Sequence, residues 1–283
     1  MRLLKYLALS SALLTLTPTR TSENVHHPPI LISSTLPLTR EDVTFPLPEI
    51  INLYTDCDQK DYSGKKPVFK KTYNEITSGV KRRRSLESRW TEYFKKQSGI
   101  EYLSMHDIDT SQRWKFPVAR KNHFDNNFND LRLRAGRWTE RHHAIDIFAK
   151  VGSEIISPMS GMVIASGNDW KGSWTKKKGF NYVAGSGLGE LPGNGAIIFS
   201  PQDTSYFYLT HMKDVHVKTG DIVSKGDFLG TVGITGNAIY PNIEEHVHLA
   251  YKKSGRGCGI DGTLVSQNPY EGLVRAKSRR NQI

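Results

Sequence analysis

The sequence predicts a mainly β protein with short, antiparallel strands. Its 283 residues include 24 Gly and 13 Pro, a composition that favours strands and turns over a helical bundle. From Trp114 onward, apolar runs of four or five residues are separated by Gly, Asn, Asp and Pro, as expected for an antiparallel sheet. A chain of this length can form one sizeable core with an extension, since domains usually span about 100 to 200 residues.

The first 22 residues are predicted to be a secretory signal peptide or an uncleaved anchor. Arg2 and Lys5 precede the apolar run 6–16, in the order found in signal peptides. This run is too short to cross a bilayer, which takes about 20 apolar residues. We therefore expect an exported protein without an integral membrane span, located in the periplasm, in the cell envelope or outside the cell.

Residues 23–115 are predicted to form an N-terminal extension. Its first part, 23–48, is rich in Pro and Thr and has no sustained apolar period, which is typical of an extended linker. A helix is expected near 85–98, where Ser85 can cap the start and apolar residues recur at helical spacing: Leu86, Trp90 and Phe94. In an exported protein the two cysteines, Cys57 and Cys258, could form a disulfide, a bond that a single pair leaves open.

The chain is strongly basic, with a formal net charge of +11 and a pI near 9.5. This balance suits an anionic partner, and export favours an acidic wall polymer over nucleic acid, for which no motif occurs. The basic run 81–84 could bind such a polymer. A solvated surface is the favoured interpretation, because no aromatic residue lies within the run. The last residues, 276–283, are expected to form a basic tail.

Five apolar runs are the predicted core strands: 162–165, 196–199, 206–209, 228–232 and 247–251. The pairs Gly220-Asp221 and Gly226-Asp227 lie on either side of Ile222-Val223, a pattern that predicts tight turns around a further short strand. No glycine pattern typical of a dinucleotide or phosphate site occurs between a strand and a helix.

Side chains that can bind a metal occur in three short segments of this β domain: 142–146, 209–211 and 245–249. Because side chains alternate along a strand, His246 and His248 point to the same face. Zinc accepts neutral imidazole and carboxylate, and a catalytic zinc site uses three protein ligands with an open fourth position. His142, Asp146 and one member of the His pair provide that number. A lone His on a strand is more often structural, and the ligand-like clusters elsewhere are interpreted so: 26–27, 106–109 and 123–125.

The order of these motifs resembles the lysostaphin-type, LytM-like zinc endopeptidases. That family has a His-x-x-x-Asp motif, then an isolated His, then His-x-His, and all three parts occur here in that order. The flanking segment Phe116-Pro117-Val118 is also similar, as is a Gly-rich series before the last motif, from Gly220 to Gly236. The resemblance covers about 114–251 and leaves the extension unexplained.

The resemblance implies a zinc metallopeptidase domain over 116–275, with an open groove and one Zn²⁺ per chain at its floor. His142, Asp146 and His248 would hold the zinc, while His211 and His246 would flank the attacking water. The implied reaction is hydrolysis of amide bonds in peptidoglycan stem or cross-link peptides. The alternative is a non-catalytic wall-binding or hydrolase-regulating protein on the same fold, against which the intact ligands argue.

The departures from the family concern the surroundings of the ligands. Ala144 and Leu209 stand where the family usually has Gly and an aromatic residue, and an insertion spans 169–194. Its aromatic residues would either line a cleft or pack on the domain as a hairpin: Trp170, Trp174, Phe180 and Tyr182. A further hypothesis is that the extension covers the groove, with His106, Asp107 or Asp109 in the open zinc position. The alternative is a helical domain that binds the wall or supports the sheet.

Overall fold

The computed structural model describes residues 73–98, 114–119, 122–134, 137–175, 179–181, 187–189, 191–257 and 260–280. All of them belong to one compact unit. The expected signal segment, both cysteines and the cluster at 106–109 lie outside these ranges. Within the part of the chain that is described, no helix has the length and apolar character needed to cross a membrane.

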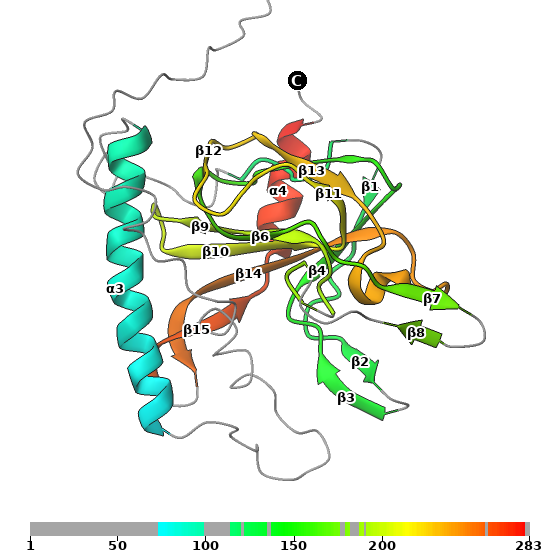
Figure 1. The fold of residues 1–283 in the computed structure, drawn as a ribbon, viewed down its shortest axis with the longest axis horizontal. Coiled ribbons are helices and arrows are strands. Elements are labelled where there is room, and N and C mark those ends of the chain that lie inside the picture. Colours follow the sequence, from blue (N-terminus) through cyan, green and yellow to red (C-terminus); the bar gives the residue numbers. More distant parts are fainter. Residues whose placement is uncertain are drawn as a thin grey trace, which may run out of the picture. The chain divides into compact units, whose positions relative to one another are not determined.

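Eight antiparallel strands form a large sheet in the order β1-β4-β14-β10-β9-β6-β12, with β15 beside the second half of β14 (Figure 1). The strands are β1 (Asn122–His123), β4 (Ile145–Ala149), β6 (Gly161–Gly167), β9 (Gly195–Ser200), β10 (Ser205–Thr210), β12 (Ile222–Val223), β14 (His246–Gly257) and β15 (Ile260–Gln267). The predicted β, antiparallel fold is therefore confirmed. The turns around β12 are also as expected, since Gly220 and Gly226 have φ values of +94° and +97°.

Smaller elements surround this sheet. A second sheet has the order β11-β13-β5, and two hairpins pair β2 with β3 and β7 with β8. Their bounds are β2 (Leu131–Arg134), β3 (Arg137–Arg141), β5 (Glu154–Ile156), β7 (Ser173–Thr175), β8 (Gly179–Asn181), β11 (Met212–Val215) and β13 (Phe228–Val232). The helices are α3 (Tyr73–Ser98), the short 3-10 helix η2 (Gly236–Ile239) and α4 (Tyr270–Arg280).

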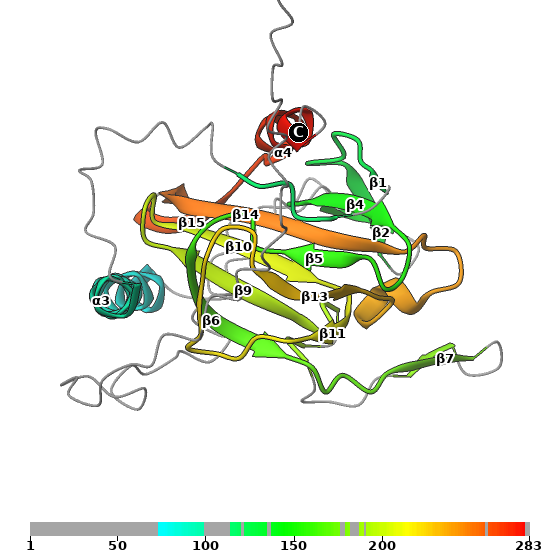
Figure 2. The same cartoon turned by 90° about the horizontal axis from the view of Figure 1, so that it is seen from above.

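The two faces of the large sheet pack against different layers. Along β14, Val247 and Leu249 belong to a core cluster that includes α4 and the second sheet, whereas Ala250 belongs to a cluster that includes α3. This division follows from the alternation of side chains along a strand. Figure 2 shows α3 and α4 on opposite sides of β14. Both faces of the sheet are consequently covered, which explains why strands such as β9 and β10 are buried at every position.

The predicted extension helix is confirmed, but it begins at Tyr73, earlier than the expected 85. Its buried face reaches back to Val80 and includes Arg83, whose residue exposure is only 1%. The Arg83 Nε lies 2.9 Å from Glu87 Oε1, and its Nη2 donates to Ser254 Oγ (3.1 Å) and to the Gly262 carbonyl. The surface interpretation of the run 81–84 was therefore wrong for Arg83, because Glu87 and the sheet supply partners that make its burial possible.

The second helix, α4, continues to Arg280 and so includes most of the segment expected to form a basic tail. Three basic side chains of α4 donate hydrogen bonds to backbone carbonyl groups at the start of the β domain. Lys277 Nζ donates to Asn122 at 3.0 Å, Arg279 Nη2 to Trp114 at 3.3 Å, and Arg280 Nη1 to Val118 at 2.5 Å. These bonds fasten α4 to the segment 114–122, where Trp114 also packs with Phe207 and Tyr251.

Candidate metal centre

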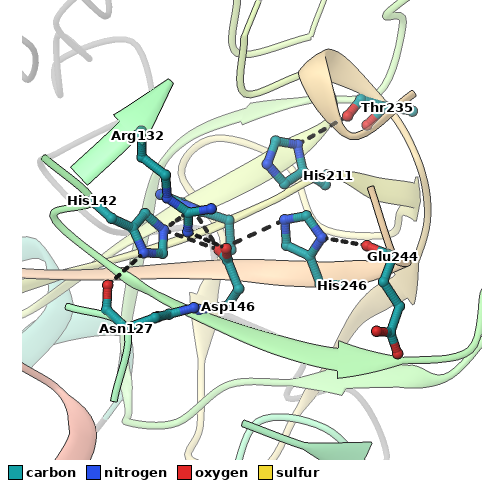
Figure 3. Close-up of polar contacts among 9 residues, drawn as sticks. Asn127, Arg132, His142, Asp146, His211, Thr235, Glu244 and His246 are labelled. Atoms are coloured by element: carbon teal, nitrogen blue, oxygen red, sulfur yellow. Dashed lines mark hydrogen bonds and ion pairs between the residues drawn. The ribbon is translucent and has the colours of Figure 1, made fainter. Parts of the chain in front are cut away.

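The pairing of three neighbouring strands brings the candidate site residues together. Asp146 of β4 is opposite His248 of β14, and His248 is opposite Thr210, the last residue of β10. His246 lies on the same face of β14 two residues earlier, and His211 directly follows β10. His142 lies in the connection between β3 and β4. The structure therefore places all five predicted residues in one site, and Figure 3 labels four of them: His142, Asp146, His211 and His246.

Three of these side chains form a group that can hold a metal ion. The Nε2 atom of His142 lies 3.1 Å from both His248 Nδ1 and Asp146 Oδ1, and His248 Nδ1 lies 3.0 Å from the same oxygen. His142 and Asp146 are buried, while the His248 side chain is 30% exposed. Over the ranges that the structure describes, no other group of His, Cys, Asp and Glu has this arrangement. The remaining ligand-like cluster in those ranges fits its structural interpretation, because the His123 ring stacks on Phe148.

Backbone carbonyl groups orient three of the four imidazole rings. The Nδ1 atoms lie within hydrogen-bond distance of carbonyl oxygens: His142 at 3.1 Å from Asn127, His211 at 2.9 Å from Thr235, and His246 at 2.7 Å from Glu244. A carbonyl oxygen only accepts, so Nδ1 must carry the proton in each case. The Nε2 atom of a neutral ring is then left with a lone pair. For His142 this atom points at the Asp146 carboxylate (Figure 3).

The charge states suit a metal. Burial alone would raise the pKa of Asp146, but hydrogen bonds and charges from His142 and His248 outweigh it and hold the pKa well below its usual range. Burial lowers the pKa of His248. The pKa of His211 lies well below its usual value, because burial and the neighbouring imidazoles of His246 and His248 both lower it. The ionised carboxylate is the form of Asp146 that binds a metal, and a bound cation would take the place of the protons that His142 and His248 now direct at it.

Comparison with known proteins agrees with this arrangement. Residues 140–259 match the model of peptidase family M23. This stretch of the chain therefore carries the sequence pattern of an M23 peptidase domain. This assignment bears out the resemblance to lysostaphin-type peptidases on which the sequence prediction rested.

Several solved structures are similar to this chain. One is a zinc-containing peptidase from Vibrio cholerae, 19% identical, with a TM-score of 0.36; the match covers 49% of this chain but only 36% of that one. Another, from Ruminococcus gnavus, is provisionally assigned as the glycyl-glycine endopeptidase LytM; it is 16% identical over 85% of this chain and 84% of its own, with a TM-score of 0.40. The lysostaphin catalytic domain from Staphylococcus simulans is 20% identical over 54% and 92%, with a TM-score of 0.31. No curated protein matches the sequence.

His211 is held in an unusual backbone conformation. Its φ is +64°, in the left-handed region that residues with a Cβ seldom adopt. The surrounding backbone fixes this conformation: the His211 N–H donates to the Pro192 carbonyl (3.0 Å), and the next N–H donates to Asn194 (3.0 Å). The Thr235 hydroxyl donates to the Met212 carbonyl (2.9 Å) and accepts from the Asn194 N–H (2.9 Å). The ring of His211 is therefore fixed at the edge of the metal group, 4.9 Å from the His246 ring.

Two residues that support the ligands carry no recognisable signal in the sequence. Arg132 Nη2 donates to Asp146 Oδ2 at 2.5 Å, and the Asn127 side chain accepts from the Asp146 N–H at 3.4 Å. Both lie before residue 140, where the M23 match begins. Asparagine and arginine are common on surfaces, so their types carry no signal. The only available clue was their position just ahead of the His-x-x-x-Asp motif.

The departures from the family pattern have structural explanations. Ala144 is fully buried within the cluster that packs against α3. Leu209 is buried on the opposite face of the sheet, while Tyr208 lies on the α3 face. In the insertion, β7 and β8 form a hairpin with Trp174 opposite Phe180, and Trp170 is buried, as the hairpin interpretation expects. Tyr182 lies outside the described residues.

Proposed function

We propose that this M23 protein is a zinc-dependent endopeptidase that hydrolyses amide bonds in the stem or cross-link peptides of peptidoglycan. The observation that carries the proposal is the convergence of His142 Nε2, Asp146 Oδ1 and His248 Nδ1, which lie 3.0 to 3.1 Å from one another. Two imidazoles and one carboxylate are a ligand set of catalytic zinc sites, which keep a further position open. These residues therefore fit one Zn²⁺ per chain.

The proposed reaction uses the two remaining histidines for proton transfer and charge stabilisation. When bound, zinc would supply Lewis-acid activation of the scissile carbonyl and of water. His211 is kept neutral by burial, so its ring can accept a proton from the attacking water at neutral pH and return it to the leaving amine. His246, whose Nδ1 donates to the Glu244 carbonyl, would serve the same step or, once its Nε2 carries a proton, would stabilise the negative charge that develops on the carbonyl oxygen.

The proposed substrate follows from the family and from the charge of the chain. Lysostaphin-type peptidases act on the peptides of bacterial walls, and a net charge of +11 would attract the protein to anionic wall polymers. The apolar N-terminus supports export to the periplasm, the cell envelope or the exterior, where that substrate occurs. Neither the motifs nor the family favours nucleic acid as a partner.

The test is digestion of purified peptidoglycan by the zinc-loaded protein, with the released fragments identified by mass. We expect fragments with new amino termini within the stem or cross-link peptides, and none with Asp146→Ala. If the zinc-loaded protein binds the wall and leaves every peptide bond intact, the non-catalytic, wall-binding alternative is correct.

A further inference from the structure

A side chain outside the family match touches the candidate metal centre. The Nη2 atom of Arg132, in β2, donates to Asp146 Oδ2 at a distance of 2.5 Å (Figure 3). We propose that Arg132 is a positioning residue of the zinc site, which holds Asp146 so that only its Oδ1 atom is offered to the metal. The inference rests on the proposed zinc function.

The two oxygens of Asp146 have different partners. Oδ1 lies 3.1 Å from His142 Nε2, 3.0 Å from His248 Nδ1 and 3.6 Å from His246 Nε2, so it faces the metal group. Oδ2 receives the Arg132 guanidinium. A carboxylate without such a partner can rotate and offer both oxygens to a cation, which raises the coordination number. The planar guanidinium instead fixes the carboxylate through a directional, charge-assisted hydrogen bond.

The surroundings of the pair distinguish it from an ordinary surface salt bridge. The side chain of Asp146 is 6% exposed and that of Arg132 is 44% exposed, so the bond forms at the boundary between the buried site and solvent. Arg256 and Asp261 form a similar pair at 3.0 Å, but their side chains are 70% and 73% exposed. Exposed pairs contribute little energy. Arg256 is thus a matched control with the same chemistry away from the metal group.

The β2–β3 hairpin links Arg132 to a second ligand. Arg132 is opposite Glu140 in the hairpin, and β3 ends one residue before His142. At the base of the hairpin, the Asn129 N–H donates to the His142 carbonyl (2.7 Å) and the His142 N–H donates to the Asp130 carbonyl (2.9 Å). These bonds fix the position of β2 relative to the ligands. The support for Asp146 and the backbone of His142 therefore belong to one local unit.

Two effects of the guanidinium on zinc affinity oppose each other. Its positive charge repels the cation, while its hydrogen bond orients the ligand. The charge is partly screened by solvent, since Arg132 is 44% exposed. Residues that orient metal ligands typically change metal affinity by about 10- to 100-fold when they are replaced. We expect orientation to dominate, so that loss of Arg132 weakens zinc binding.

The experiment compares Arg132→Met, Arg132→Lys and the control Arg256→Met in the full chain. Zinc affinity is measured by competition with a chelator, and Co²⁺ is substituted for zinc because its visible spectrum reports the coordination geometry. Arg132→Met should bind zinc about 10- to 100-fold more weakly. Its Co²⁺ form should absorb more weakly, because a freed Asp146 carboxylate that offers both oxygens raises the coordination number of the metal. Lysine keeps the reach and a charged donor, so Arg132→Lys should restore most of both properties. Arg256→Met should match the unchanged chain.

The outcomes separate this inference from the proposed function. If the unchanged chain does not bind zinc, the proposed function fails. If the unchanged chain binds zinc and Arg132→Met shows the same affinity and cobalt spectrum, or binds zinc more tightly, the positioning role is wrong. Thermal unfolding of the metal-free proteins is measured in parallel. A loss of affinity that follows a loss of metal-free stability, and that lysine does not restore, would assign Arg132 a merely structural role.

Discussion

The two ends of β14 carry buried polar clusters of opposite character. At the C-terminal end of β14, which we call the far end, Arg83 and Glu87 of α3 contact Tyr206 and Ser254 of the sheet. A cation, an anion and two hydroxyl groups are there the partners of one another. At the N-terminal end of β14, which carries the metal group, ring nitrogens of His142 and His248 converge on the Oδ1 atom of Asp146. A buried polar cluster that satisfies itself is structural, whereas one whose acceptors share a common point is suited to a cation.

The largest effect is expected at the metal group. Replacement of His142, Asp146 or His248 by Ala leaves two protein ligands, too few for a tight site, and should lower zinc occupancy and abolish hydrolysis. Metal analysis of each purified variant is the measurement. Full zinc occupancy in any one variant would exclude that residue from the ligand set.

The second effect separates proton transfer from metal binding. His211→Ala and His246→Ala should keep their zinc and lose about 10²- to 10⁴-fold in turnover, the usual contribution of a positioned acid or base. The variants are compared in zinc content and in the rate of stem-peptide hydrolysis. Loss of zinc equal to that of the ligand variants would mean that ligand and catalyst have been interchanged.

The third effect concerns the far cluster. Arg83→Met leaves Glu87 buried without its cation, and should destabilise the protein by about 3 to 5 kcal/mol. The exposed neighbour Arg82 is the control, and Arg82→Met should change stability by less than about 0.5 kcal/mol. Denaturant unfolding measures both, and zinc affinity of the folded Arg83→Met protein should be unchanged. A loss of zinc affinity would show that the two clusters are coupled.

The smallest effect concerns the net charge. Raising the ionic strength from about 0.1 M to about 1 M shortens the screening length from about 10 Å to about 3 Å. Binding to anionic wall polymers should weaken by several-fold, whereas the rate on a short neutral stem peptide should stay the same. Co-sedimentation with purified walls and a peptide assay measure the two. Equal loss in both assays would point to an effect of salt on the site itself.

The strands and ligand residues could be predicted because their signals are local. Even an apolar run as short as 162–165 lies in a strand. The residue types of His142, Asp146 and His248, and their spacing in the sequence, indicate a metal site without any knowledge of the tertiary fold. The contacts of Arg83 and Arg132 depend on which distant segments become neighbours, and no local pattern contains that information. The helix α4 was missed for a similar reason, since only Leu273 and Ala276 among its residues are buried.

The length of β14 has a consequence for how such a protein can diverge. This strand of 12 residues pairs with β4 through its first half and with β15 through its second. A slip by one residue would turn His246 and His248 to the wrong face and would also separate Ser254 from Arg83. The alignment of His246 and His248 is therefore secured by contacts remote from them. The segment 237–245, which directly precedes His246, can then change in length and sequence while the positions of the two histidines are preserved.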